Sequence, residues 1–222
     1  MRSSDYFPAG SVLKKTEEWM EYLRSNARIR HRIPFKTDDL ALLVIDAQKA
    51  FLSPVGSAFL ASSTVIKMIS QYVDFAQKQG IPIIFTRHAH DSSDDGGMMS
   101  RFYNGLIREG STDSELLDIF SGIESCKTIK KKSYDAFRNT ELLEYLTKKS
   151  IKRLLVCGVV THLCVETTCR SAFMEGFEVF IAVDGCASYT ETLHLASLLS
   201  LCDAAAIPVS QESVTGGSDC LT

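Results

Sequence analysis

Short runs of apolar residues alternate along this chain with longer segments in which apolar residues recur at helical spacing. Residues 40–45 form an uninterrupted apolar run that ends at Asp46, and residues 81–86 and 151–157 repeat the pattern. Runs of this length are typical of strands that are buried on both faces of a parallel sheet. Residues 62–79 carry apolar side chains three and four positions apart, which predicts an amphipathic helix between two of these strands.

The order of the segments predicts one doubly wound α/β domain. Strands that alternate with helices form βαβ units with right-handed crossovers, and these units build a mostly parallel sheet with helices on both faces. We expect this domain over residues 38–222, preceded by an N-terminal helical arm, residues 1–37, whose residues 11–25 form an amphipathic helix. The other expected elements are a polar, glycine-rich loop at 87–104, a short helix at 114–120, a strand at 127–130, a helix at 139–149, a helix at 164–175, a strand at 178–183, a helix at 190–204 and a strand at 205–209.

Composition narrows the choice of partners and compartment. The 222 residues are 45% hydrophobic and 23% charged, with a formal net charge of −3, so there is no basic field for nucleic acid. No apolar segment approaches the roughly 20 residues of a membrane span, and the first residues lack the apolar core of a signal peptide. We therefore expect a cytoplasmic protein that binds neither nucleic acid nor membrane.

Cofactor and metal signatures are missing from the sequence. Seven cysteines are scattered without a Cys-x-x-Cys pair, which argues against both a disulfide framework and a zinc cluster. Neither the glycine-rich dinucleotide fingerprint nor the phosphate-binding loop occurs. His88 and His90 are two residues apart on an extended segment, but the sequence offers them no obvious third ligand. No cofactor and no metal are expected.

Three reactive side chains follow predicted strands. Asp46 ends the first strand, Lys131 follows the strand at 127–130, and Cys164 follows the strand at 151–157. Ligands of open parallel sheets bind beyond the carboxyl ends of the strands, so we expect the three to converge. A carboxylate that accepts the thiol proton and an ammonium that stabilises the thiolate suit acyl transfer. The predicted helix start at Cys164 would also lower the pKa of its thiol.

Each of these residues also has an ordinary structural interpretation. A carboxylate at the end of a strand is often a turn former, a lysine between two other lysines is usually solvated, and a thiol in an apolar context is often buried and inert. The joint pattern of all three favours catalysis.

Three motifs carry a resemblance to a known family: residues 46–51, residues 131–137 and residues 158–166. With these motifs the chain resembles the isochorismatase-like cysteine hydrolases, which include nicotinamidases and N-carbamoylsarcosine, ureidoacrylate and biuret amidohydrolases. The resemblance implies that Asp46, Lys131 and Cys164 form a catalytic triad. It also implies a cis peptide bond between Val159 and Val160, and an oxyanion hole made by the backbone N–H groups of Val160 and Cys164.

The resemblance further implies hydrolysis of a small amide, ureido or carbamoyl substrate through a covalent thioester, and a homo-oligomer, either a dimer or a tetramer. Two alternatives stay open, which are isochorismatase-type hydrolysis of a vinyl ether and a non-catalytic family member. His162 stands where true isochorismatases carry His, but those enzymes have Gly in place of the nucleophile. The Asp-x-His metal motif of nicotinamidases is not present at residues 87–91. Candidate substrate contacts are Phe51, Arg87, His88, Tyr134, Phe137 and His162.

Overall fold

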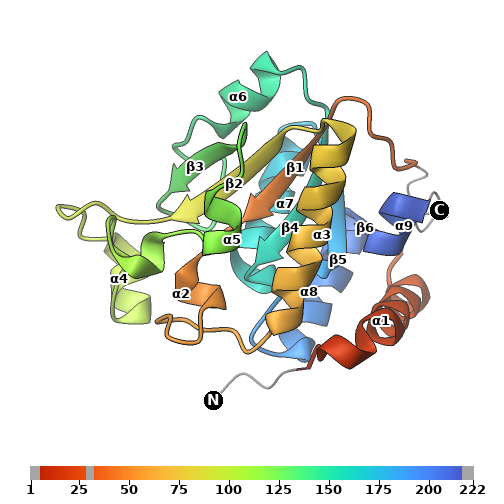
Figure 1. The fold of residues 1–222 in the computed structure, drawn as a ribbon, viewed down its shortest axis with the longest axis horizontal. Helices are drawn as coiled ribbons and strands as arrows, with labels where there is room; N and C mark the ends of the chain where they lie inside the picture. The colour runs from red at the N-terminus through yellow and green to blue at the C-terminus, as the bar shows by residue number, and fades with distance from the viewer. Residues whose placement is uncertain (1–5, 29–32, 217–222) are drawn as a thin grey trace.

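The computed structural model describes residues 6–28 and 33–216 (Figure 1). Within this part of the chain, the centre is a six-stranded sheet in the order β3-β2-β1-β4-β5-β6, with all neighbouring strands parallel. The chain winds outward from β1 to β3, returns to β4 beside β1, and winds outward again to β6. This confirms the predicted doubly wound fold. The strands are β1 (Leu40–Ile45), β2 (Ile83–His88), β3 (Lys127–Lys131), β4 (Arg153–Val159), β5 (Glu178–Ala187) and β6 (Ile207–Val209).

Helices cover both faces of the sheet; in Figure 1, α3 crosses in front of it and α7 and α8 lie behind. Side chains alternate across a strand, so β1 feeds both cores. Leu43 and Ile45 pack with α7 and α8, whereas Leu42 and Val44 pack with α3. The helices are α1 (Val12–Asn26), α2 (Lys49–Leu52), α3 (Ser63–Gln79), α4 (Gly97–Tyr103), α5 (Asp118–Ser121), α6 (Leu142–Lys148), α7 (Glu166–Met174), α8 (Glu191–Ala204) and α9 (Gln211–Gly216), with 3₁₀ turns η1 (Ala9–Ser11) and η2 (Thr112–Ser114) and a π-helical turn η3 (Thr161–Val165).

The predicted loop at 87–104 is wrong in two respects. Arg87 and His88 belong to β2, because they pair with Lys130 and Lys131 of the neighbouring strand β3. The predicted loop also contains helix α4, which begins directly after Gly96. The backbone of Gly96 itself has a left-handed conformation. The end of β2 depends on the neighbouring strand with which it pairs, and the composition of residues 87–104 gives no information about that neighbour.

The segment around Cys164 also differs from the prediction. β4 runs on to Val159 and α7 begins only at Glu166. The Val159–Val160 peptide bond is cis, as expected from the resemblance. Cys164 therefore lies inside the π-helical turn η3 and not at the start of a regular helix.

The predicted helix of the N-terminal arm is present as α1, which packs against α8 and β5. The boundary between arm and domain at residue 37 stays a prediction, and residues 1–5, 29–32 and 217–222 lie outside the described part. In the described part of the chain, no helix combines the length and apolarity needed to cross a bilayer. The cysteines described there are all free thiols, whereas Cys220 is among the residues not described.

Candidate active site

The three reactive side chains meet at the carboxyl edge of the sheet, where the strand order reverses between β1 and β4. Lys131 Nζ lies 2.7 Å from Asp46 Oδ2 and donates a hydrogen bond to Cys164 Sγ at 3.2 Å. It also donates to the carbonyl oxygen of Ser133 at 3.0 Å. Asp46 is 0% exposed, Lys131 1% and Cys164 5%, so the cluster is almost fully removed from water.

The backbone around β1 fixes the position of Asp46. Its φ is +47°, a left-handed conformation that Asp tolerates better than most residues. The Thr86 hydroxyl, from β2, donates to Asp46 Oδ1 at 2.6 Å and accepts from the Asp46 backbone N–H at 3.1 Å. Gly158 of β4 allows the close approach on the other side, because a Cβ there would lie 2.1 Å from the Ile45 carbonyl oxygen.

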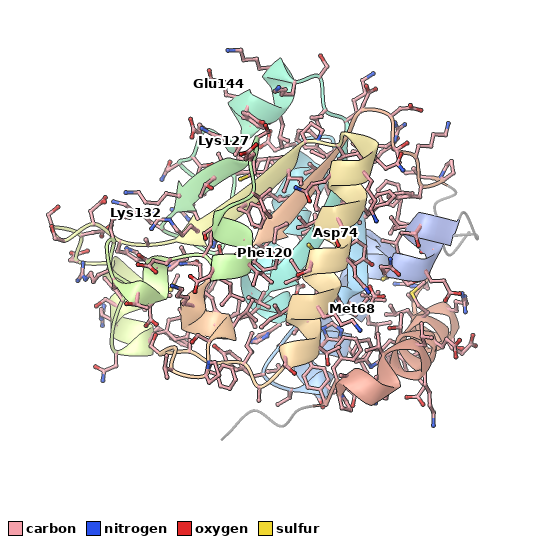
Figure 2. The ribbon with its side chains drawn as sticks, in the orientation of Figure 1. Met68, Asp74, Phe120, Lys127, Lys132 and Glu144 are labelled. Carbon is pink, nitrogen blue, oxygen red and sulfur yellow. The ribbon has the colours of Figure 1, made fainter. Side chains whose placement is uncertain are left out.

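Strand alternation explains why only one of three consecutive lysines joins the site. The Lys131 side chain lies on the buried side of β3, toward Asp46 and Cys164. The side chains of Lys130 and Lys132 lie on the opposite side and form ion pairs with Asp91. Figure 2 shows Lys132 at the outer edge of the molecule, beside the segment that contains α4. Thus the solvated-lysine interpretation holds for the neighbours of Lys131 and is wrong for Lys131 itself.

Burial dominates the electrostatics of the cluster. Burial lowers the pKa of Lys131, but the Asp46 carboxylate and Cys164 outweigh it, and the pKa is raised. Burial raises the pKa of the Cys164 thiol to about 12; Lys131 opposes this shift and Asp46 adds to it. The expectation of a thiol acidified by a helix N-terminus is therefore wrong: Cys164 does not begin a regular helix, and burial raises the pKa of its thiol.

A cavity of about 390 Å³ opens onto the nucleophile. Of the predicted substrate contacts, it is lined by Phe51, His88 and Tyr134, together with Val160 and Cys164 of the predicted oxyanion hole. A cavity of this size is within the range of small-molecule sites, which start near about 300 Å³.

The other three predicted contacts do not line this cavity. Arg87 donates to Glu109 Oε1 at 2.7 Å, on the opposite side of β2 from His88. Phe137 packs against Phe177, with ring centroids 5.9 Å apart, so its role is core packing. His162 Nδ1 is hydrogen bonded to Ser188 Oγ at 2.6 Å.

The structure adds cavity residues that the sequence analysis did not single out. Tyr103, on α4, contributes a hydroxyl that is hydrogen bonded to the Tyr134 hydroxyl, and Tyr189 and Leu163 form further apolar wall. Gln48 lies behind His88: its side chain accepts from the His88 N–H at 2.7 Å and donates to the His88 carbonyl at 3.0 Å. Gln48 belongs to the first family motif, so a signal for it was present; Tyr103 and Tyr189 are brought in only by the fold.

The rings of His88 and His90 lie next to each other, but the described residues around them provide no third metal ligand. Their rings are 5.0 Å apart, and each has one buried nitrogen without a hydrogen-bond partner, His88 Nδ1 and His90 Nε2. A bound metal needs at least one more ligand, but the other His90 nitrogen is 3.2 Å from Asp94, which also pairs with Lys132. Among the described residues, no group of three or more histidine, cysteine or acidic side chains is arranged to hold a metal.

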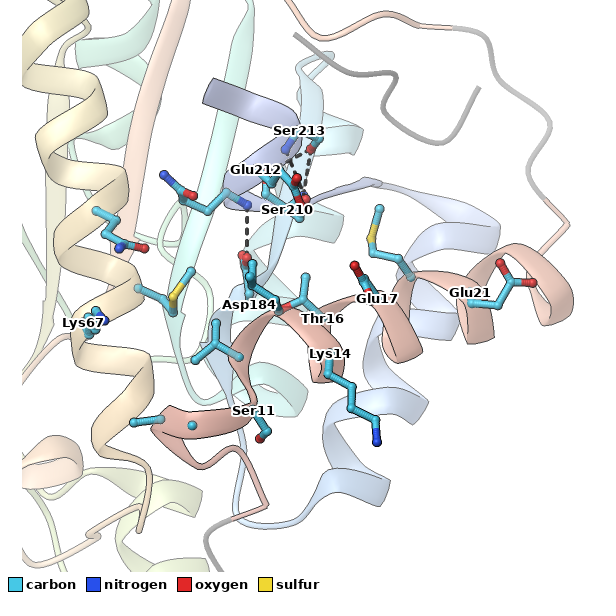
Figure 3. A pocket seen from close by; sticks show the side chains of 18 of the residues that line it. Ser11, Lys14, Thr16, Glu17, Glu21, Lys67, Asp184, Ser210, Glu212 and Ser213 are labelled. Carbon is cyan, nitrogen blue, oxygen red and sulfur yellow. Dashed lines mark hydrogen bonds between the residues drawn. The ribbon is translucent and has the colours of Figure 1, made fainter. Parts of the chain in front are cut away.

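A larger cavity of about 880 Å³ lies elsewhere, between α1, α3 and α9 (Figure 3). Asp184 lines it, and burial raises the pKa of that carboxyl group. Asp184 is already bound by Tyr72 and by the backbone N–H of Gln211. Among the described residues, the lining of this larger cavity contains no cysteine or histidine, so the smaller cavity beside Cys164 is the candidate active site.

The order of the parallel strands defines a doubly wound α/β protein. The buried Asp–Lys–Cys cluster at the carboxyl edge of the sheet is typical of an enzyme active site. A family model described as "Isochorismatase domain" matches residues 40–213, and the chain therefore belongs to the isochorismatase family of hydrolases.

Individual proteins agree with this assignment. The chain is 38% identical over 164 residues to Nicotinamidase 3 of Arabidopsis thaliana, which covers 72% of this chain and 79% of that protein. It is 29% identical over 174 residues to the ureidoacrylate amidohydrolase of Cronobacter sakazakii, covering 67% of this chain and 75% of that one. The crystal structure of a cysteine hydrolase from Pseudomonas syringae shares the fold, with a TM-score of 0.78 and 22% identity over 82% of this chain and 93% of that chain.

Proposed function

We propose that this protein hydrolyses a small, uncharged amide through a thioester on Cys164. The observation that carries the proposal is the buried cluster in which Lys131 contacts both Asp46 and the thiol. Amide-hydrolysing relatives, the nicotinamidase and the ureidoacrylate amidohydrolase, support the same reaction type.

The first half of the reaction forms the thioester. Because the thiol is protonated at rest, it must lose its proton as it attacks the substrate carbonyl, and Asp46 is the base placed to accept it. The N–H groups of Val160 and Cys164 stabilise the oxyanion that forms. When the C–N bond breaks, Asp46 passes the proton to the leaving nitrogen, which departs as ammonia or an amine.

The second half regenerates the enzyme. A water molecule attacks the thioester and Asp46 takes its proton. The C–S bond then breaks, and Asp46 returns that proton to the Cys164 sulfur, which releases the acid and restores the resting thiol. Lys131 keeps its positive charge throughout and stabilises the sulfur whenever it is negative.

The charge of the cavity selects the substrate class. Among the described residues that line it there is no lysine or arginine, whereas Asp113 contributes a carboxylate. Burial, with help from the Lys131 charge, lowers the pKa of His88 to about 4, so His88 is neutral at pH 7. A substrate carboxylate would find no cation and would face Asp113. Phe51, Tyr103 and Tyr189 instead offer a flat apolar wall for an uncharged ring or amide.

The test is ammonia release from a matched panel. Nicotinamide, pyrazinamide and biuret are uncharged, whereas N-carbamoylsarcosine and ureidoacrylate carry a carboxylate. Each is assayed with the wild type, with Cys164→Ala, and with Cys126→Ala as a control, because Cys126 is a half-buried thiol outside the cavity.

We expect release from an uncharged amide that is lost in Cys164→Ala and kept in Cys126→Ala. Release that survives in Cys164→Ala refutes thiol catalysis, and a preference for the carboxylate-bearing compounds refutes the substrate class. Isochorismate, assayed for vinyl-ether hydrolysis, tests the remaining enzymatic alternative. The cytoplasmic location, the homo-oligomer and the absence of nucleic-acid and membrane partners stay predictions from the sequence.

A further inference from the structure

The N-terminal arm lies outside the stretch matched by the family model, and none of its described residues lines the cavity beside Cys164. Two aromatic residues of the arm nevertheless contact His194, a buried residue of α8. The Trp19 ring, 2% exposed, lies 4.7 Å from the His194 ring between centroids, and the Tyr6 ring lies 6.0 Å from it. Trp19 Nε1 also donates to Glu191 Oε1 at 2.8 Å, which ties the arm to the first turn of α8.

His194 connects that aromatic cluster to the turn that carries the nucleophile. Its Nδ1 is hydrogen bonded to the Thr161 hydroxyl at 2.9 Å, and both residues are 0% exposed. Thr161 opens the π-helical turn η3, directly after Val160 and three residues before Cys164. Ser197, one turn further along α8, donates to the Thr161 carbonyl at 3.1 Å. Thr161 is thus held by two side chains of α8, by His194 at its hydroxyl and by Ser197 at its backbone carbonyl, and His194 is packed against the arm.

A second connection runs in parallel. The Tyr6 hydroxyl accepts from the Ser188 N–H at 2.8 Å, and Ser188 Oγ is hydrogen bonded to His162 Nδ1 at 2.6 Å. His162 is the residue after Thr161. Two consecutive residues of the nucleophile turn are therefore connected to the arm, each through one residue of the C-terminal half of the chain.

We propose that His194 is a positioning residue for the nucleophile, which holds the turn 161–165 through Thr161 and is itself held in place by Trp19 of the N-terminal arm. The physical reason is that the Cys164 thiol must stay within reach of both Lys131 and the substrate carbonyl. Small displacements of a reacting group are costly, because a misplacement of about 1 Å can slow a reaction about 100-fold. A buried hydrogen bond from a fully packed ring restrains the turn more firmly than solvated contacts could.

The experiment compares variants that lose the hydrogen bond with variants that keep one. Thr161→Val removes the hydroxyl at nearly constant shape, whereas Thr161→Ser keeps it. His194→Leu removes the ring nitrogen, whereas His194→Asn keeps a polar nitrogen near the Nδ1 position. Trp19→Ala is compared with Leu23→Ala, since Leu23 is also a buried α1 residue but belongs to a different core cluster.

Two readouts are needed, because the turnover readout rests on the proposed function. The first is kcat and KM for the amide found in the panel, and the second is the rate at which iodoacetamide alkylates Cys164, located by mass spectrometry. Alkylation requires no turnover. If the wild type hydrolyses no amide, the proposed function fails while the alkylation rates still test the positioning of the thiol.

We expect kcat to fall about tenfold or more in Thr161→Val, His194→Leu and Trp19→Ala, with KM within about twofold of wild type. Alkylation of Cys164 should change at least about threefold in the same variants, because the thiolate fraction and its access both depend on where the turn holds the sulfur. Thr161→Ser and Leu23→Ala should keep both wild-type rates, and His194→Asn should recover most of the loss. Wild-type rates in Thr161→Val and His194→Leu would overturn the proposal, as would equal losses in Thr161→Ser and Leu23→Ala.

Discussion

Removing the cation of the buried Asp46–Lys131 pair should strongly lower the stability of the folded protein. The paired atoms are 2.7 Å apart, and both side chains have no exposed surface. Lys131→Met keeps most of the chain length of the side chain but leaves the Asp46 carboxylate buried without its cation. Breaking a buried pair in this way costs about 3–5 kcal/mol of stability. For a chain of this size, about 2–4 °C of Tm per kcal/mol gives a drop of about 6–20 °C.

Two further variants separate burial from charge. Lys130→Met removes the neighbouring lysine, which is 39% exposed and pairs with Asp91 at the surface, and it should cost little stability because solvent screens such a pair. The double variant Asp46→Asn with Lys131→Met removes both buried charges together. Asn is suited to the left-handed conformation at this position, so the double variant should cost less than Lys131→Met alone.

Urea unfolding followed by circular dichroism measures the stability of all four proteins, with ammonia release as the parallel activity assay. Activity should be lost in both Lys131 variants and kept in Lys130→Met. The reasoning fails if Lys131→Met costs no more stability than Lys130→Met, or if the double variant is less stable than Lys131→Met.

Three other predictions follow from the same structure. Because burial raises the pKa of Cys164 to about 12, its alkylation should accelerate about tenfold per pH unit from about pH 7 to about pH 10, and a plateau below about pH 9 would contradict this. Gly158→Ala should lower the thermal unfolding midpoint by at least about 4 °C, since its Cβ would lie 2.1 Å from a β1 carbonyl at a φ of +119°, whereas Gly122→Ala, with no atom within 4 Å, should not. Burial lowers the pKa of both His88 and His194 from 6.5 to about 4, so the unfolded chain binds protons in that window that the folded chain does not. Stability in urea should therefore fall as pH drops from about 6.5 to about 4, by up to about 3 kcal/mol per histidine, and a flat profile over that range would contradict the shifts.

Much of the fold can be predicted from the local pattern of apolar residues. A strand that is buried on both faces of the sheet consists almost entirely of apolar residues, so it is visible in the sequence as an apolar run. The predicted strand at 40–45 has the observed bounds of β1, and the helix at 62–79 differs from α3 by one residue. Errors concentrate where a partner sets the boundary. β2 was expected at 81–86 but extends to His88, because β3 offers it partners at Lys130 and Lys131.

The site divides in the same way. Asp46, Lys131 and Cys164 could be named in advance, since each follows a strand and the carboxyl ends of parallel strands share one edge. Tyr103, Tyr189 and His194 could not, because they reach the site from α4, from the segment after β5 and from α8. Arg87 and Phe137 are predicted as substrate contacts because they lie near the strand ends that carry the triad; the side of β2 on which Arg87 lies and the packing of Phe137 on Phe177 place both elsewhere.

By itself, then, the sequence determined the alternation of strands and helices and the choice of Asp46, Lys131 and Cys164 as the candidate reactive residues, because each is a property of residue type and spacing. Only the tertiary structure decided the raised pKa of Cys164, which residues line the cavity beside it, and the connection of the N-terminal arm to the nucleophile turn. These depend on desolvation and on contacts between residues far apart in the chain, such as Trp19 with His194, which spacing along the chain does not encode.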